Sequence, residues 1–331
     1  MNPPKVSDED YINFLVATPR VCSGVEAART TPKEDAAPAH DAFTRLLHRL
    51  EPDAETLWQE AAPQVQRTTG ILVIDDSTLD KPYAKNIELV QRHWSGKHRE
   101  VVEGINLITL LWTDGDRHVP CDYCLFDKTN DSLTKNDHFQ AMLRTAHERG
   151  FVPRCVVFDS WYSSLNNLKT IRDFGWSWLT RVKSNRLVNP DRQGLRAVSA
   201  VATDECGCVV HLKGYGMIRL FKIVAPDGDI EWWATNDLQM SEMGRVKVAG
   251  FAWTIENYHR GIKQCCGIER AQVRAARAQR NHIGLALRAF LRLESHCYNT
   301  GVSWFEAKTS IIREAVRNYV ANPLYLLTPT A

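Results

Sequence analysis

The sequence predicts an α/β protein with a central mixed sheet, a β-rich insertion that interrupts it, and helices at both ends of the chain. Three observations support this prediction. Two continuous apolar runs, Ile71–Ile74 and Cys155–Phe158, each end in aspartate, as expected of strands buried on both faces. Residues 183–240 hold short β-type runs separated by Gly and Asp. Residues 1–69 and 241–331 carry apolar side chains at helical spacing.

Residues 1–69 are expected to form an N-terminal helical module that could bind DNA. Apolar side chains recur every three to four residues in segments 8–16 and 41–50. Segment 31–39, which contains two prolines, is expected to be the loop between them, and another short helix lies between Pro52 and Pro63. A helix-turn-helix arrangement fits this pattern, but no motif identifies one.

Residues 70–182 are expected to form five strands and two helices. The predicted strands are 71–74, 101–112, 119–126, 155–158 and 176–182. The predicted helices are 137–149, which ends at Gly150, and 164–174. An order of three strands, helix, strand, helix, strand is that of a ribonuclease H-like core, in which an antiparallel meander is joined by later parallel strands.

The remainder of the chain is expected to hold the insertion and the last part of the core. Strands are predicted at 208–212, 217–224 and 230–234, within the β-rich insertion 183–240. Residues 241–331 are predicted to be the helical remainder of the core, with helices at 248–265 and 281–298 and a basic C-terminal part.

Composition indicates a globular protein without a membrane span. Hydrophobic residues make up 44% and charged residues 24% of the 331 residues, and no apolar run approaches the roughly 20 residues that cross a bilayer. The first residues are polar, which argues against a secretory signal. Nine cysteines, an odd number, favour reduced thiols; Cys121 and Cys124 have zinc-ligand spacing but no matching second pair. We therefore expect a cytoplasmic protein.

The charges are unevenly distributed along the chain. Residues 1–70 carry 7 Lys and Arg against 11 Asp and Glu, whereas residues 256–331 carry 11 against 5. A basic C-terminal part is compatible with contacts to the phosphates of a nucleic acid, and an acidic N-terminal part is not an obvious electrostatic DNA-binding arm.

Three carboxylates are the candidate catalytic residues and metal ligands. Asp76 and Asp159 each stand at the carboxyl end of a predicted strand, and a buried carboxylate there is costly unless a cation compensates it. Magnesium prefers such oxygen ligands, and two ions would support an in-line displacement at phosphorus. Glu256 is the natural third acid, because a helix would place it on one face with Arg260 and Lys263.

Each of these signals has an ordinary structural explanation when taken alone. An aspartate after a strand is usually a turn or helix-cap residue, and Glu256 with Arg260 is usually a surface ion pair. Their occurrence together, in the order expected through the strands and helices, favours the catalytic interpretation. The sequence has neither a nucleophile-elbow pattern nor a Gly-rich phosphate loop.

At these residues the chain resembles the insertion-sequence DDE transposases, in the branch with a β-rich insertion before the glutamate. The resemblance spans roughly residues 70–300. Its motifs are Ile74-Asp75-Asp76-Ser77-Thr78-Leu79, Val157-Phe158-Asp159-Ser160-Trp161-Tyr162 and Ile255-Glu256 through Lys263. The branch has the signature Y-x2-R-x3-E-x6-K, and Glu256 and Lys263 fill its last two positions. Asp75 and Asp76 face opposite ways on a strand, so only one can be a ligand, and the family pattern selects Asp76.

The resemblance implies a cut-and-paste reaction on double-stranded DNA. Two Mg²⁺ ions, or Mn²⁺ in their place, would be bound by the three acids, and the protein would cut at transposon terminal inverted repeats and join the freed end to target DNA. It further implies a homodimer on DNA and a location at the nucleoid. Relatives that form hairpins hold a flipped base on a Trp of the insertion, where Trp232 and Trp233 stand here.

Basic and polar side chains near these motifs are candidate DNA contacts. Besides the two tryptophans, they are Lys183, Asn185, Arg186, His259, Arg260, Lys263, Arg270, Arg274 and Arg277. The last three are expected at helical spacing. A solvated surface is the competing interpretation of each.

The signature is incomplete, and this leaves other functions open. Its Arg and Tyr positions are Ala252 and Ala249. A domesticated or inactive transposase that binds DNA without cutting would tolerate these alanines. A plain structure-specific nuclease of the same fold would cut without joining.

Overall fold

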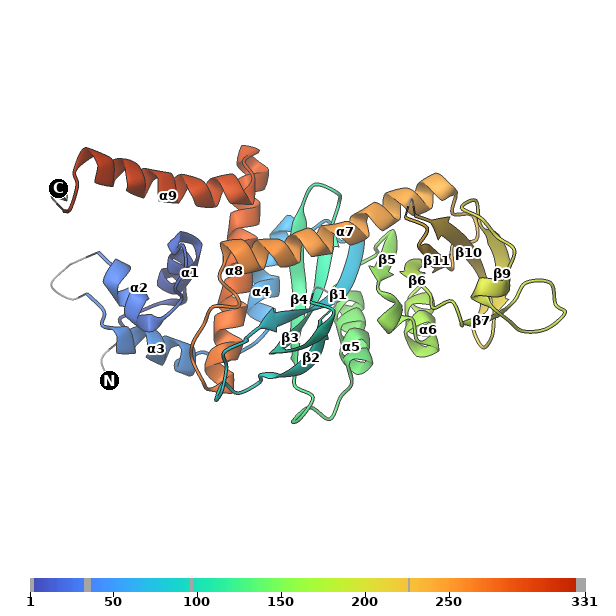
Figure 1. Cartoon of the computed structure of the whole chain (residues 1–331), viewed down its shortest axis with the longest axis horizontal. Coiled ribbons are helices and arrows are strands. Elements are labelled where there is room, and N and C mark those ends of the chain that lie inside the picture. Colours follow the sequence, from blue (N-terminus) through green and yellow to red (C-terminus); the bar gives the residue numbers. More distant parts are fainter. Residues whose placement is uncertain (1–2, 33–36, 96–97, 226, 326–331) are drawn as a thin grey trace, which may run out of the picture. The chain divides into compact units, whose positions relative to one another are not determined.

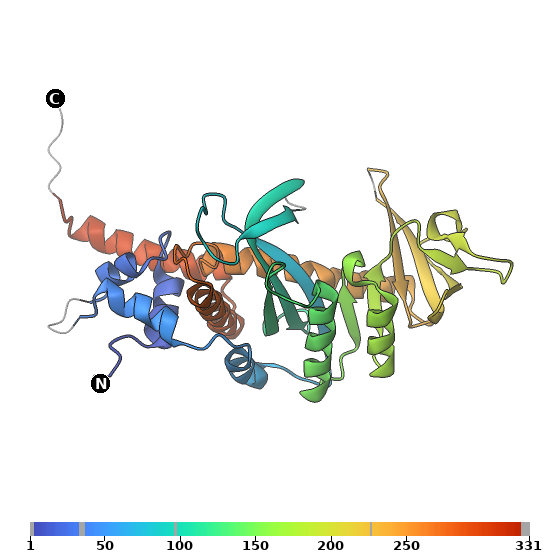
Figure 2. The same ribbon diagram turned by 90° about the horizontal axis from the view of Figure 1, so that it is seen from below.

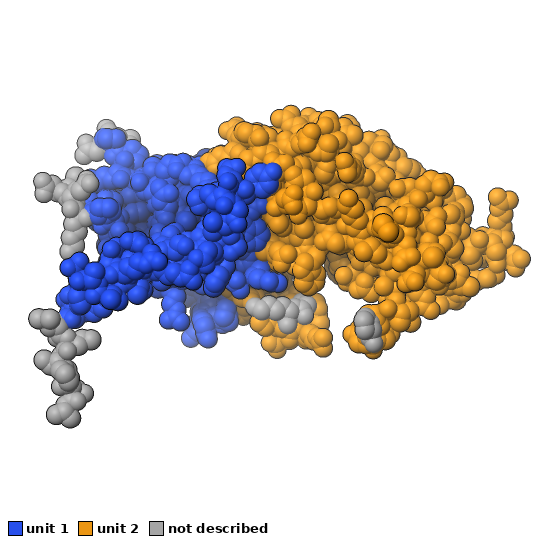
Figure 3. Space-filling view, turned by 90° about the horizontal axis from the view of Figure 1, so that it is seen from above, with its two compact units in different colours: residues 1–53, 81–90, 260–331 blue, residues 54–80, 91–259 orange. Residues whose placement is uncertain are grey.

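The structure is a computed structural model that describes residues 3–32, 37–95, 98–225 and 227–325. Part of the expected loop at 31–39 therefore lies outside the described residues. The chain forms two compact units (Figure 3). Unit 1 comprises residues 1–53, 81–90 and 260–331, and unit 2 comprises residues 54–80 and 91–259.

Unit 2 is built on one large sheet (Figure 1). Within the described residues its strands are β1 (Ile71–Asp80), β2 (Gln91–Ser95), β3 (Glu100–Thr113), β4 (His118–Phe126), β5 (Cys155–Phe158), β6 (Trp178–Arg181), β7 (Leu187–Asn189), β8 (Arg196–Ala197), β9 (Cys208–Leu212), β10 (Gly216–Val224) and β11 (Ile230–Thr235). They lie in the order β2-β3-β1-β5-β6-β11-β10-β9-β7-β8, and β4 pairs with β3.

The centre of this sheet has the ribonuclease H-like arrangement. Strands β1, β3 and β4 form an antiparallel meander, and β5 and β6 join β1 as parallel strands. The predicted α/β fold class is therefore confirmed. Strand β2 was not expected, because its two inward-facing residues are the polar His93 and Ser95, which leave no apolar alternation in the sequence.

Strands β7–β11 extend the sheet beyond β6. Strand β11 runs antiparallel to β6 with Trp233 opposite Arg181, so the segment between β6 and the next helix is joined to the core by backbone hydrogen bonds. The strands predicted at 208–212, 217–224 and 230–234 correspond to β9, β10 and β11.

Helices cover both faces of the core sheet (Figures 1 and 2). Helices α5 (Lys135–Glu148) and α6 (Leu165–Asp173) lie on one face, and the unit 2 part of α7 (Glu242–Cys265) crosses the other. On the α5 face, the ring of Phe139 lies 5.2 Å from that of Phe158. Helix α4 (Glu55–Ala61) packs on β4.

Unit 1 is helical. Its helices are α1 (Asp8–Ala17), α2 (Gly24–Thr30), α3 (His40–Arg49), α8 (Ala276–Thr300) and α9 (Trp304–Ala321). The N-terminal helices pack with α8: Tyr11 Oη lies 3.0 Å from His282 Nδ1, and Asn281 donates to the carbonyl oxygens of Leu47 and Leu50. Residues 1–53 thus share a unit with the C-terminal helices, where the sequence suggested a separate module.

None of the helices in the described residues is both long enough and apolar enough to cross a membrane.

Candidate active site

The pairing of β1 with β5 determines which aspartate of the Asp75-Asp76 pair lies beside Asp159. The two strands are parallel, with Ile74 opposite Phe158. One residue further along each strand, Asp75 and Asp159 stand side by side on one face of the sheet. Because successive side chains of a strand point to opposite faces, Asp76 points to the other face.

Asp75, Asp159 and Glu256 line one cavity on the α7 face of the sheet. The cavity has a volume of about 250 Å³. Its lining is completed by Arg181 and Trp233 and by the apolar residues Val73, Ile74, Val157, Phe158 and Ile255. Asp75 is partly buried, whereas Asp159 and Glu256 are exposed at the surface. Two parallel strand ends and one helix thus bring three carboxylates to one place.

The electrostatics of this cavity favour a bound cation. Burial, followed by the charges of Asp76, Asp159 and Glu256, raises the pKa of Asp75 well above its ordinary value. A positive ion would relieve this repulsion, and carboxylate oxygens are the ligands that Mg²⁺ prefers. The residues present therefore fit a divalent metal ion. Among the described residues, no three His, Cys, Asp or Glu side chains are already close enough together to hold one ion.

Asp76 is held on the opposite face by three donors. Its carboxylate accepts hydrogen bonds from Asn106 (2.7 Å), Lys135 (2.8 Å) and Tyr162 (2.7 Å). Burial alone would raise the pKa of Asp76, but the Lys135 charge and these hydrogen bonds outweigh it and lower the pKa below its ordinary value. The choice of Asp76 over Asp75 as the metal ligand does not fit this geometry, because its oxygens are already satisfied away from Asp159 and Glu256.

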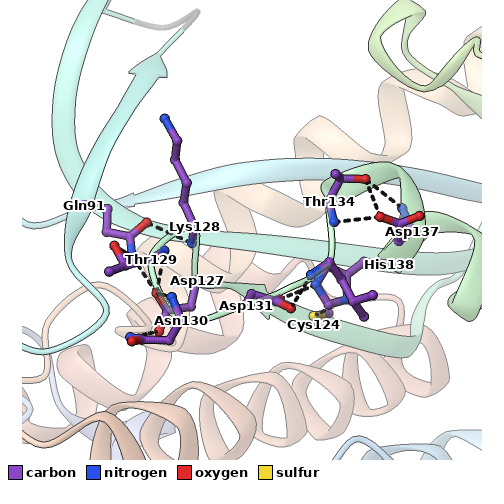
Figure 4. Close-up of polar contacts among 11 residues, drawn as sticks. Gln91, Cys124, Asp127, Lys128, Thr129, Asn130, Asp131, Thr134, Asp137 and His138 are labelled. Atoms are coloured by element: carbon purple, nitrogen blue, oxygen red, sulfur yellow. Dashed lines mark hydrogen bonds and ion pairs between the residues drawn. The ribbon is translucent and has the colours of Figure 1, made fainter.

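Polar contacts connect the loop between β4 and α5 with the first turn of α5 (Figure 4). Thr134 and Asp137 form a capping box at the start of α5, which fixes the helix end that carries Lys135. Asp131 bonds His138 Nε2, and His138 Nδ1 lies 3.3 Å from Cys124 Sγ on β4. Cys124 of β4 thus contacts a histidine in the first turn of α5.

The two tryptophans of β11 face opposite sides of the sheet. Trp233 lines the cavity of Asp75, Asp159 and Glu256, here called the acidic cavity, and 6% of its surface is exposed. The Arg181 guanidinium lies 5.3 Å from the centroid of its ring. Glu231 ties the pair together, since it accepts from Trp233 Nε1 (2.9 Å) and lies 3.2 Å from Arg181. Trp232 instead packs under Lys222.

The basic and polar residues expected to contact DNA differ in their location and in their exposure to solvent. Lys183, Asn185 and Arg186 line a second cavity in unit 2. Arg260 and Arg274 are exposed, and His259 is buried.

Three other cations of this set bind groups within unit 1. Lys263 lies 2.9 Å from Glu269, Arg270 donates to the Pro19 carbonyl oxygen, and Arg277 donates to that of Leu50. The expectation that Arg270, Arg274 and Arg277 stand on one helix is wrong, because α8 begins only at Ala276.

Sequence reasoning missed two residues of the cavity, Asp75 and Arg181. The signal for Asp75 was present: four apolar residues precede Asp75, and four precede Asp159, so the two occupy equivalent positions on their strands. Arg181 gave no such signal, because its place depends on the pairing of β6 with β11.

The chain is similar to one protein family and to two solved transposase structures. A family profile described as "DDE superfamily endonuclease" matches residues 12–213, which include Asp75 and Asp159 but not Glu256. The piggyBac transposase in a synaptic complex with hairpin DNA is 12% identical, with a TM-score of 0.52 over 98% of this chain and 77% of that chain. The Drosophila P element transposase strand transfer complex is 14% identical, with a TM-score of 0.28 over 53% of this chain and 38% of that chain.

The comparisons differ in what they establish. No curated protein sequence matched the chain. The piggyBac similarity supports the ribonuclease H-like fold. The family match covers more than half of the sequence, and the chain therefore belongs to the DDE superfamily endonucleases.

Proposed function

We propose that the protein is a DNA transposase that cuts double-stranded DNA at transposon ends and joins the freed end to target DNA. The observation that carries this proposal is the meeting of Asp75, Asp159 and Glu256 with Arg181 in one cavity. Membership of an endonuclease family supports the cutting step. The similarity in fold to a transposase solved with hairpin DNA is compatible with the joining step.

The residues of the cavity have distinct roles in this proposal. Asp75, Asp159 and Glu256 would hold two Mg²⁺ ions, or Mn²⁺ in their place. When bound, such ions activate the attacking oxygen and stabilise the leaving oxygen. Arg181 stands beside the carboxylates and would balance the negative charge of the scissile phosphate. Its stacking on Trp233 and its pairing with Glu231 keep the guanidinium in place.

In this proposal Trp233, rather than Trp232, is the aromatic residue that would contact a base near the cut. It lines the cavity, whereas Trp232 faces Lys222. An indole can stack on an extruded base, which is what a hairpin intermediate requires. The remaining exposed cations, Arg260 and Arg274, are candidate phosphate contacts. Bringing two ends together would require a homodimer on DNA, and such a protein would work at the nucleoid.

The test is a cleavage assay on DNA that carries the inverted repeats flanking the gene. The purified chain is incubated with labelled DNA and Mg²⁺ or Mn²⁺, with Glu256→Gln as control. We expect metal-dependent cutting at the repeat boundary, loss of cutting in the variant, and joined products when target DNA is added.

Two outcomes would replace the proposal. Cutting without joining would indicate a structure-specific nuclease of the same fold. Specific binding without cutting in either metal would indicate a DNA-binding protein derived from a transposase, a function with which Ala249 and Ala252 at the signature positions are compatible.

A further inference from the structure

A second cavity lies in unit 2, at the start of α6. Its volume is about 620 Å³, within the range of pockets that enclose a small ligand. Two short segments join the cavities. Asp159 lines the acidic cavity and Trp161 the second one, and Arg181 lines the first and Lys183 the second. The same two segments of the chain thus contribute to the lining of both cavities.

The second cavity is basic. Lys183, Arg186 and Lys213 line it, and no Asp or Glu does. In the described part of the chain, none of these three side chains forms a hydrogen bond or an ion pair. Arg186 is the most significant, because it is only partly exposed and burial lowers its pKa. A guanidinium withdrawn from water without an anion is unfavourable, so the cavity favours an anionic ligand.

Two further features of the lining suit a nucleotide. The first is Trp161, whose side chain is 60% exposed although it is large and apolar. An exposed indole at a basic cavity is a platform for a base. The second is the N-terminal end of α6, which begins at the cavity with Leu165 and adds partial positive charge.

We propose that this cavity binds one nucleotide of a single DNA strand that leaves the acidic cavity. Arg186, with Lys183 and Lys213, contacts the phosphate, and Trp161 stacks on the base. A single strand fits better than a duplex, because a paired base is already stacked on both sides and has no free face for the indole. The proposal rests on the proposed function for the direction of the strand, but the binding itself needs no cleavage.

The test measures DNA binding by the full chain without divalent metal. Fluorescence anisotropy follows a labelled single-stranded oligonucleotide and the matching duplex for wild type, Trp161→Ala and Arg186→Gln. Trp94→Ala and Arg154→Gln are matched controls: Trp94 is 68% exposed on β2, and Arg154 is exposed at the amino end of β5.

We expect Trp161→Ala to weaken single-strand binding about tenfold or more, and Trp161→Phe to retain most of it. Arg186→Gln should lower the slope of log affinity against log salt by about 0.7, the value for one phosphate of a single strand. Neither control should change either quantity.

Other results would overturn the inference. Unchanged single-strand binding in Trp161→Ala and Arg186→Gln would remove the cavity as a binding site. Equal losses for single strand and duplex would mean that the cavity contacts a duplex backbone. The proposed function is tested separately. If wild type cleaves DNA and the variants bind single strands as wild type does, only the proposal for the second cavity is contradicted. If wild type does not cleave DNA but the variants lose single-strand binding, only the proposed transposase function is contradicted.

Discussion

At the scale of single residues, Asp75 and Asp76 are neighbours in opposite electrostatic surroundings. Burial and then the neighbouring carboxylates raise the pKa of Asp75. For Asp76 the Lys135 charge and the hydrogen bonds from three donors outweigh burial and lower the pKa. When the pKa of a group is higher in the folded than in the unfolded chain, the stability that this group contributes is lost as the pH rises through the folded-state pKa. A lowered one means that stability is present above the ordinary carboxyl pKa and is lost as pH falls through the folded value. Above the ordinary carboxyl pKa the raised pKa of Asp75 therefore opposes folding, and the lowered pKa of Asp76 favours it.

Replacing each aspartate by asparagine should show that Asp75 and Asp76 affect stability in opposite directions. At pH 7 without metal, Asp75→Asn should raise the free energy of unfolding. Asp76→Asn should lower it by about 1–3 kcal/mol, because Lys135 loses its partner in a largely buried place. Urea unfolding of both variants provides the measurement. If both variants lose stability alike, the two carboxylates do not differ as described.

His282 in α8 is a buried histidine that must remain neutral. Its Nε2 lies 3.2 Å from the Gly267 carbonyl oxygen, which can only accept, so Nδ1 accepts from the Tyr11 hydroxyl. Burial, with a smaller effect of Lys81, lowers the pKa of His282 to about 3.

This histidine should make the protein less stable in mild acid. The unfolded chain takes up a proton near pH 6.5 and the folded chain does not, so stability falls as pH drops from that value toward about 3. Between pH 7 and pH 5 we expect a loss of about 2 kcal/mol from this group. Unfolding curves at the two pH values measure it, and His282→Gln should reduce the difference. A difference that persists unchanged in the variant would assign the effect to other groups.

At the scale of elements, the sequence predicted the strands and helices that apolar runs define and failed where strand pairing decides. Strands β1 and β5 and helix α5 were predictable, because their buried faces leave a periodic pattern. The face of the sheet to which each acid points was harder to predict. Strand β1 continues past Ile74 to Asp80, so Asp75 and Asp76 both lie within it and point to opposite faces. A count of residues from the start of each apolar run would have selected Asp75.

Lys308 of α9 stabilises the end of α1 through its side chain. Its ammonium donates to the carbonyl oxygens of Leu15, Val16 and Thr18, where the last turn of α1 has no partners of its own. Lys308→Met should leave these oxygens unsatisfied and lower the free energy of unfolding by about 1–3 kcal/mol. The exposed Arg317→Met on the same helix is the control and should change it by less than about 0.5 kcal/mol. Similar values for the two variants, measured by urea unfolding, would exclude the capping role.

At the scale of the whole molecule, some of the charges that are unevenly distributed along the sequence pair with one another inside unit 1. The acidic N-terminal helices pair with the basic α8: Arg288 lies 2.8 Å from Asp8, and Arg292 binds Glu9. Arg277 likewise pairs with Glu51. Part of the C-terminal basic charge therefore forms ion pairs within unit 1. Net charge per segment could not reveal this, because it does not tell which charges meet.

A bound metal ion should stabilise the folded chain as a whole. Any ligand that binds only the folded state raises stability, by about 2.7 kcal/mol at a hundred times its dissociation constant. We expect Mn²⁺ to raise the melting temperature of wild type and to raise that of Asp159→Asn less. Thermal unfolding across a Mn²⁺ titration measures this, with Asp173→Asn, an exposed acid of α6, as the control. Equal shifts in all three proteins would place the metal elsewhere.

The central claim is that Asp75, Asp159 and Glu256 form the catalytic set, and the most direct measurement compares Asp75→Asn with Asp76→Asn. Each variant is assayed for metal-dependent nicking of the repeat-bearing DNA under conditions in which wild type cuts. The account predicts that Asp75→Asn loses about a hundredfold or more in rate, as expected when a group that stabilises the transition state is removed. Asp76→Asn should continue to cut, with a lower stability. The reverse result, an inactive Asp76→Asn beside an active Asp75→Asn, would contradict the assignment.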